Sequence, residues 1–122
     1  MKKKILVIED NKINMKLVRT LLQIGKYEIM EAEDAESGIE MARSDSPDMI
    51  LMDIQLPGID GFEATAILKS DPATSNIPIV ALTSYAMDGD KKRAQEVGCD
   101  GYICKPIDTR TFLKEIGKFF AS

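Results

Sequence analysis

Short runs of consecutive apolar residues alternate along this chain with longer segments in which apolar residues recur at helical spacing. The alternation repeats five times within 122 residues. Continuous apolar runs are typical of parallel strands that are buried on both faces, and the helices between such strands cover both faces of the sheet. The sequence therefore predicts one α/β domain with a doubly wound parallel sheet of five strand-helix units.

The expected elements follow from this alternation and from the capping residues at helix ends. Apolar runs predict strands over residues 4–9, 27–32, 48–53, 77–82 and 101–104. Helical spacing predicts helices over residues 11–24, 62–70 and 89–97, and two more after the N-caps Asp34 and Asp108. The first helix is predicted from the stripe Ile13, Leu17, Leu21 and Ile24. Residues 48–53 are the most apolar run, so we place that strand at the sheet centre, with Asp53 at its carboxyl end.

The chain contains no histidine. This absence excludes Ser-His-Asp triads, Cys-His pairs, HExxH zinc sites and facial-triad iron sites, all of which need an imidazole. It also excludes a phosphohistidine on this chain. The two cysteines cannot provide a structural zinc site by themselves.

Charge and hydropathy limit the partners and the compartment. The formal net charge of −4 argues against a broad nucleic-acid footprint. No apolar run approaches the ~18 residues of a membrane span, and the run after the N-terminal lysines is too short for a signal peptide. We therefore expect a cytoplasmic protein with no membrane insertion.

Polar residues follow four of the five expected strands. Ligands bind to doubly wound sheets at the carboxyl ends of the strands, so these side chains should meet in one crevice. They are Glu9, Asp10, Asp53, Thr83 and Lys105. Clustered carboxylates repel one another, and a hard divalent cation such as Mg²⁺ relieves that repulsion.

Such a site suits phosphoryl transfer, in which Asp53 is the natural nucleophile and forms an aspartyl phosphate. Lys105 and Thr83 would then contact the phosphoryl oxygens. Taken alone, an acidic residue such as Asp10 can equally be a helix cap. The convergence of polar residues at four strand ends favours the site.

The sequence resembles the receiver domain of two-component response regulators over its whole length. The resemblance rests on the segments VIEDN, ILMDIQLPGIDG, IPIVALTSYA and YICKPI, in that order, and on the intervals 83 − 53 = 30 and 105 − 53 = 52. Within the family the chain looks most like the DivK-type single-domain regulators. The resemblance implies a flavodoxin-like (βα)5 fold with strand order 2-1-3-4-5.

The resemblance also assigns roles to residues. It implies that Asp53 is the phosphoacceptor and that Thr83 and Lys105 contact the phosphoryl group. It implies that Mg²⁺ is bound by Asp10, by Asp53 and by the backbone carbonyl of Gln55, with Glu9 acting through the water shell. It further implies that Tyr102 is an aromatic switch, paired with Thr83, and that Lys105-Pro106 is a cis peptide.

The function implied is that of a phosphorylation-dependent binding module that catalyses only its own phosphorylation and dephosphorylation. The phosphodonor would be a sensor histidine kinase or a histidine phosphotransfer protein, and a downstream protein would be the target. We expect a single receiver domain over residues 1–122, with no output domain. The expected signalling surface lies around Tyr85, Tyr102 and residues 88–97.

Two alternatives stay open at this point. The first is a Mg²⁺-dependent phosphatase or phosphotransferase with an aspartyl nucleophile. Enzymes of that kind that resemble haloacid dehalogenases carry DxDx(T/V), whereas Asp53-Ile54-Gln55-Leu56 lacks the second Asp, which is the general acid. The second alternative is a structural adaptor with a vestigial acidic site, which would bind no Mg²⁺.

Overall fold

The computed structural model describes residues 2–56, 58–83 and 88–120. The strands are β1 (Lys4–Ile8), β2 (Glu28–Ala32), β3 (Met49–Asp53), β4 (Ile79–Thr83) and β5 (Gly101–Cys104). The helices are α1 (Lys12–Ile24), α2 (Ala35–Asp45), α3 (Gly61–Ser70), α4 (Asp88–Val97) and α5 (Phe112–Phe120). Strands and helices alternate along the chain, as the sequence predicts.

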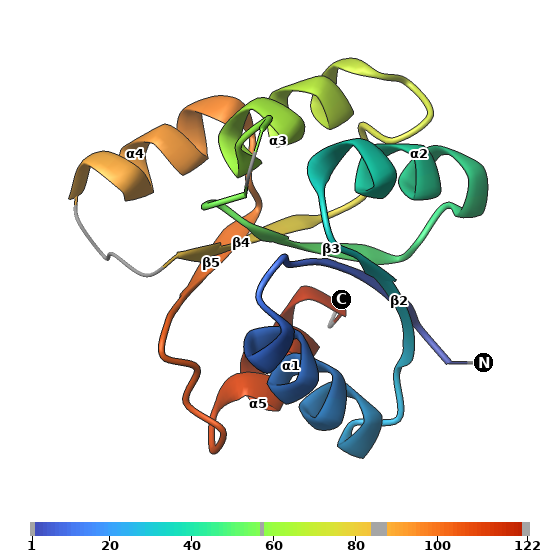
Figure 1. Cartoon of the computed structure of the whole chain (residues 1–122), viewed down its shortest axis with the longest axis vertical. Helices are drawn as coiled ribbons and strands as arrows, with labels where there is room; N and C mark the ends of the chain where they lie inside the picture. The colour runs from blue at the N-terminus through green and yellow to red at the C-terminus, as the bar shows by residue number, and fades with distance from the viewer. Residues whose placement is uncertain (1, 57, 84–87, 121–122) are drawn as a thin grey trace.

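The five strands form one parallel sheet in the order β2-β1-β3-β4-β5. Helices α1 and α5 cover one face of this sheet, and α2, α3 and α4 cover the other (Figure 1). The predicted doubly wound fold, its strand order and the central place of β3 are confirmed.

Each face of the sheet carries its own apolar core. Along β1, Ile5 and Val7 pack toward α1 and α5, while Leu6 and Ile8 pack toward α2 and α3. In a strand, successive side chains point to opposite faces, so a strand that is covered on both sides buries successive side chains and is apolar along most of its length. This is why β3 and β4 are buried at all five of their positions.

The face of helix α1 that packs against the core is not the apolar stripe from which the helix was predicted. Met15, Val18, Leu21 and Leu22 are buried. Ile13 is 80% exposed and Ile24 is 65% exposed. Both sets recur at helical spacing, so periodicity fixes the helix but does not decide which apolar face meets the sheet. The helix is therefore confirmed, and two members of the predicted stripe lie on the surface.

The beginning of α5 also differs from the prediction. Asp34 caps α2 as expected, and its carboxylate accepts a hydrogen bond from the Ser37 N–H at 2.8 Å. Asp108, in contrast, does not cap α5 directly, because the helix begins only at Phe112. The Asp108 carboxylate accepts from the Arg110 N–H at 2.9 Å, and its carbonyl accepts from the Phe112 N–H at 3.0 Å. A turn therefore stands between Asp108 and the helix.

Across the described ranges, none of the helices has both the length and the apolar character that a membrane crossing requires.

Candidate functional site

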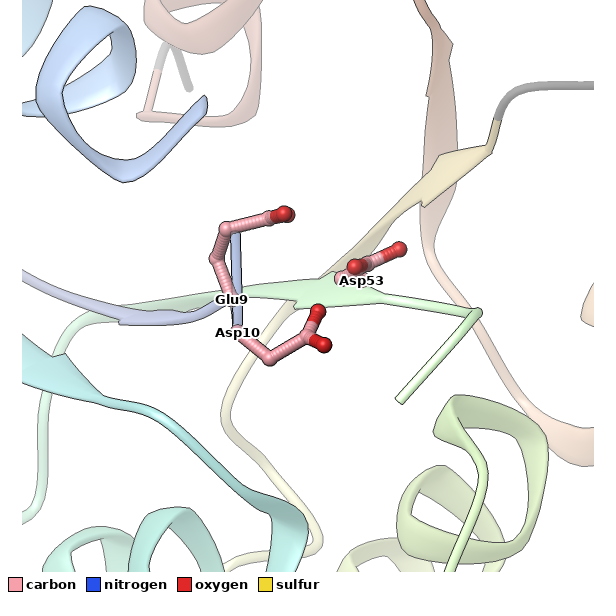
Figure 2. A group of neighbouring side chains, drawn as sticks. All are labelled: Glu9, Asp10 and Asp53. Atoms are coloured by element: carbon pink, nitrogen blue, oxygen red, sulfur yellow. The ribbon is translucent and has the colours of Figure 1, made fainter. Parts of the chain in front are cut away.

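Three carboxylates meet at the carboxyl end of the sheet, as Figure 2 shows. Glu9 and Asp10 directly follow β1, and Asp53 is the last residue of β3. One oxygen from each of the three carboxylates lies within 4.8 Å of the others. Glu9 is 1% exposed and Asp53 is 3% exposed, whereas Asp10 is exposed to solvent.

Strand pairing explains why these residues meet. β1 and β3 are neighbours, and Ile8 lies opposite Met52 in their register. The next residues along each strand therefore leave the sheet side by side. β2 lies on one side of β1, and β3 lies on the other side. The carboxyl ends of β1 and β3 are therefore also at the point where the strand order reverses.

The backbone after Asp53 is folded tightly against the site. The Gly61 N–H donates a hydrogen bond to the Ile54 carbonyl at 3.0 Å. A Cβ at Gly61 would collide with the backbone of Asp53 and Ile54. Because only glycine lacks that atom, Gly61 allows α3 to begin directly beside the carboxyl end of β3.

Asn11, and not Asp10, caps α1. Its side-chain oxygen Oδ1 accepts hydrogen bonds from the Ile13 N–H at 2.9 Å and from the Asn14 N–H at 3.0 Å. The capping alternative for Asp10 is therefore wrong. The Asp10 carboxylate belongs instead to the acidic cluster with Glu9 and Asp53.

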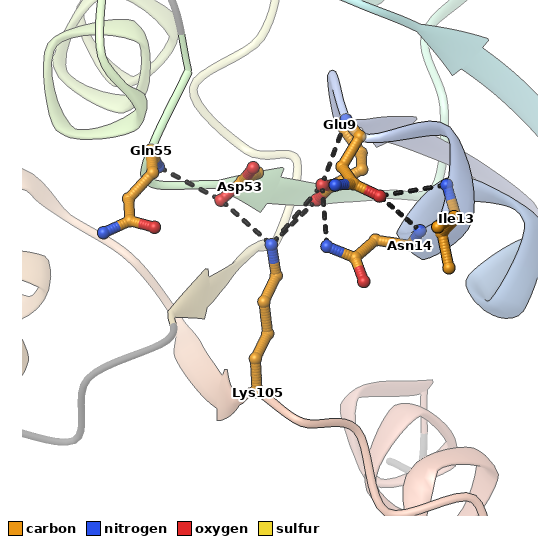
Figure 3. Close-up of polar contacts among 7 residues, drawn as sticks. Glu9, Ile13, Asn14, Asp53, Gln55 and Lys105 are labelled. Carbon is orange, nitrogen blue, oxygen red and sulfur yellow. Dashed lines mark hydrogen bonds and ion pairs between the residues drawn. The ribbon is translucent and has the colours of Figure 1, made fainter.

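Lys105 places a positive charge between two of the carboxylates (Figure 3). Its Nζ lies 3.1 Å from Oε2 of Glu9 and 3.3 Å from Oδ1 of Asp53. The side chain is 13% exposed, so this pair of contacts is largely shielded from water. Lys105 directly follows β5, its N–H donates to the Thr83 carbonyl at 2.6 Å, and Lys105-Pro106 is a cis peptide as expected.

The cluster carries more negative charge than Lys105 balances. Burial raises the pKa of Glu9 above its usual range, and the negative charge of Asp53 raises it further. Hydrogen bonds from Lys105 and Asn14, with the charge of Lys105, lower the same pKa and only partly offset that rise. A hard oxygen donor set with one solvent-exposed member fits Mg²⁺, which keeps part of its water shell when it is bound.

The other predicted site residues lie around this cluster. The Gln55 N–H donates to Oδ1 of Asp53 at 3.0 Å. Thr83 ends β4 and is 6% exposed. Tyr102 stands opposite Ala81 in the pairing of β4 with β5, and it lines a separate cavity of about 450 Å³ next to α5. Tyr85 lies outside the described residues.

Asn14 is a contact that the sequence analysis missed. Its side-chain nitrogen Nδ2 donates to Oε1 of Glu9 at 3.3 Å. Asn14 lies in the first turn of α1, four residues after Asp10. That turn stands beside the end of β1, so this position is the signal from which the contact with Glu9 could have been predicted.

The fold and this site together define a doubly wound α/β domain with an acidic cluster and a lysine at the switch point. A sequence model described as the response regulator receiver domain matches residues 5–117. The chain belongs to the response regulator receiver family.

Two relatives show which type of response regulator this chain resembles. The polar-differentiation response regulator DivK of Brucella anthropi is 41% identical over 119 residues, which are 98% of this chain and 97% of that protein. DivK of Brucella ovis matches with the same identity and coverage. The predicted DivK type is confirmed.

Solved structures agree with the fold. The chemotaxis protein CheY4 of Vibrio cholerae superimposes with a TM-score of 0.91 at 26% identity, over 97% of this chain and 98% of that one. The receiver domain of the sensor histidine kinase PA1611 from Pseudomonas aeruginosa superimposes with a TM-score of 0.92 at 28% identity, over 100% of both chains. That receiver was solved with a magnesium ion coordinated in its active site cleft.

Proposed function

We propose that this receiver takes a phosphoryl group onto Asp53 from a phosphohistidine of another protein. The observation that carries the proposal is the environment of Asp53. Its carboxylate is almost fully buried, it lies beside two further carboxylates, and its Oδ1 faces Lys105 Nζ at 3.3 Å. The donor imidazole must come from a partner, because this chain contains no histidine.

The two oxygens of Asp53 would have different tasks in this transfer. Oδ1 accepts the Gln55 N–H and faces Lys105, so we assign the attack on phosphorus to Oδ2. A P–O bond forms as the P–N bond of the phosphohistidine breaks, and its electron pair returns to the imidazole nitrogen. Lys105 is close enough to Asp53 to contact the oxygens of the transferred phosphoryl group. The Thr83 hydroxyl is the proposed hydrogen-bond donor to the same oxygens.

Magnesium is the proposed cofactor of this transfer. Asp10, Asp53 and the backbone carbonyl of Gln55 would hold it directly, and Glu9 would hold it through the water shell. When bound, the ion supplies positive charge that neutralises the transferring oxygens. The acidic cluster and the magnesium-bound receiver of PA1611 support this assignment.

The wider role follows from the family. We propose that a sensor histidine kinase or a histidine phosphotransfer protein donates the phosphoryl group in the cytoplasm, and that a downstream protein reads the phosphorylated form. The receiver would catalyse its own phosphorylation and dephosphorylation and no reaction of a metabolite. The likeness to DivK over 98% of the chain supports a role through protein contacts, with one receiver over residues 1–122.

The test is incubation with acetyl phosphate and MgCl2, followed by intact-protein mass spectrometry. The wild type should gain one phosphoryl mass. Asp53→Asn should stay unlabelled, because the amide is a far poorer nucleophile than the carboxylate. Excess EDTA should suppress labelling of the wild type, because the carboxylates then repel the incoming phosphoryl anion. Equal labelling of Asp53→Asn, or full labelling in EDTA, would overturn the proposal.

A further inference from the structure

Asn14 touches the acidic cluster from the first turn of α1. Its backbone N–H is fixed by the Asn11 cap at 3.0 Å, so the direction of its side chain is set by the start of the helix. The half-buried amide reaches Glu9 from α1, whereas Lys105 reaches Glu9 from the end of β5 (Figure 3). Asn14 therefore holds Glu9 from a second element.

Glu9 depends on few donors. In the described part of the chain, its Oε1 accepts from Asn14 Nδ2 at 3.3 Å, from the Asn11 N–H at 3.4 Å and from Lys105 Nζ at 3.4 Å. Its Oε2 accepts from Lys105 Nζ at 3.1 Å. A buried carboxylate that loses a donor is strongly disfavoured, so each of these contacts matters to the orientation of Glu9.

Lys105 contacts both Glu9 and Asp53. Its Nζ also lies 3.3 Å from Asp53, and the proposed function draws the ammonium toward the phosphoryl group on that residue. If Lys105 moves toward the phosphoryl group, its hydrogen bonds to Glu9 weaken. Of the side chains that donate to Glu9, Asn14 is then the one with no other task at the site.

We propose that Asn14 is a positioning residue that keeps the Glu9 carboxylate oriented toward the metal site, both before transfer and after Lys105 has moved to the phosphoryl group. The proposal rests on the proposed function, because it assumes that the cluster binds Mg²⁺ and that Asp53 is phosphorylated. The proposed effect of Asn14 on the metal site is exerted through its hydrogen bond to Glu9.

The first variant is Asn14→Leu, which keeps the approximate volume and removes the donor. The affinity for MgCl2, measured by titration calorimetry, should fall about tenfold, at the lower end of the usual loss when an outer-shell contact of a metal site is removed. The Mg²⁺ concentration for half-maximal labelling by acetyl phosphate should rise by the same factor, while the rate at saturating Mg²⁺ changes far less. Gln23→Leu, the same amide-to-leucine change in the last turn of α1, is the matched control.

A double-mutant cycle with Glu9→Ala decides whether Asn14 acts through Glu9. In that background Asn14→Leu should change the Mg²⁺ affinity less than twofold, because the group that Asn14 positions is gone. An unchanged affinity of Asn14→Leu alone, or an equal tenfold loss in both backgrounds, would overturn the proposal. A wild type that binds no Mg²⁺ or is not labelled on Asp53 would instead overturn the proposed function. Thermal unfolding of every variant checks that it is folded.

Discussion

Burial and a neighbouring negative charge disfavour the ionised form of Glu9 when no metal is bound. Burial and the nearby Asp53 raise its pKa above the usual value of 4.5. A raised pKa means that the folded protein binds this proton more tightly than the unfolded chain does. The stability that Glu9 contributes is therefore fully present below pH 4.5 and is lost as the pH rises through the pKa of the folded state.

Glu9→Gln should consequently raise the unfolding temperature of the metal-free protein at pH 7, because the glutamine carries no charge to be buried. Lys105 keeps Asp53 as a partner at 3.3 Å in this variant. The advantage should disappear below pH 4.5, where the wild-type side chain is also neutral. Thermal unfolding in EDTA across pH 4 to 8 measures this, with the exposed Glu40→Gln as control. A lower unfolding temperature of Glu9→Gln at pH 7 would contradict the prediction.

At the scale of the helix, α1 presents apolar surface to solvent beside the site. Ile13 is 80% exposed in the first turn, two residues after the cap Asn11, and Ile24 is 65% exposed in the last turn. The proposed donor must bring an imidazole to Asp53, so its surface must cover the site end of this helix. Burial of an exposed isoleucine is worth about 1.5–3 kcal/mol.

Ile13→Ser should lower kcat/KM for transfer from the partner's phosphohistidine about tenfold or more, because docking then buries a hydroxyl in place of the apolar side chain. Labelling by acetyl phosphate should not change, since that small donor needs no docking surface. Ile24→Ser, at the far end of the same helix, is the matched control and should have little effect. An equal loss in both variants would place the contact elsewhere along α1.

The elements themselves show what a sequence can predict. β1 and β3 each contain four consecutive apolar residues because both faces of the sheet are covered, so the strands and the convergence of Asp53 with Glu9 and Asp10 were predictable. The buried face of α1 was not, since two apolar stripes share one period and only packing against α5 and the sheet selects between them. The Asn14 contact required the relative placement of a helix turn and a strand end, which no spacing rule supplies.

At the scale of the whole molecule, the proposed function requires that a phosphoryl charge on Asp53 cause a change at a distant surface. Thr83 ends β4, Lys105 directly follows the neighbouring strand β5, and Tyr102 lies on β5 beside the cavity next to α5. Helix α4 is tied to α3 through Arg93, whose guanidinium lies 4.4 Å from the centre of the Phe62 ring and 3.7 Å from Asp60. Arg93 is about half exposed, so its ion pair with Asp60 contributes little to holding α4 in place.

Thr83→Ala should therefore separate phosphorylation from its readout. The variant keeps the backbone carbonyl that accepts the Lys105 N–H, so Lys105 stays in place and Asp53 should still be labelled. It loses the hydroxyl that we expect to move toward the phosphoryl oxygen and to make room for the Tyr102 ring, in a two-state equilibrium biased by covalent charge. Amide chemical-shift mapping with a beryllofluoride mimic should show wild-type changes over α4, β5 and α5, and Thr83→Ala should lose most of them. Changes confined to α1 and α2 in the wild type, or an unaltered response in Thr83→Ala, would mean that the signal leaves the site by another route.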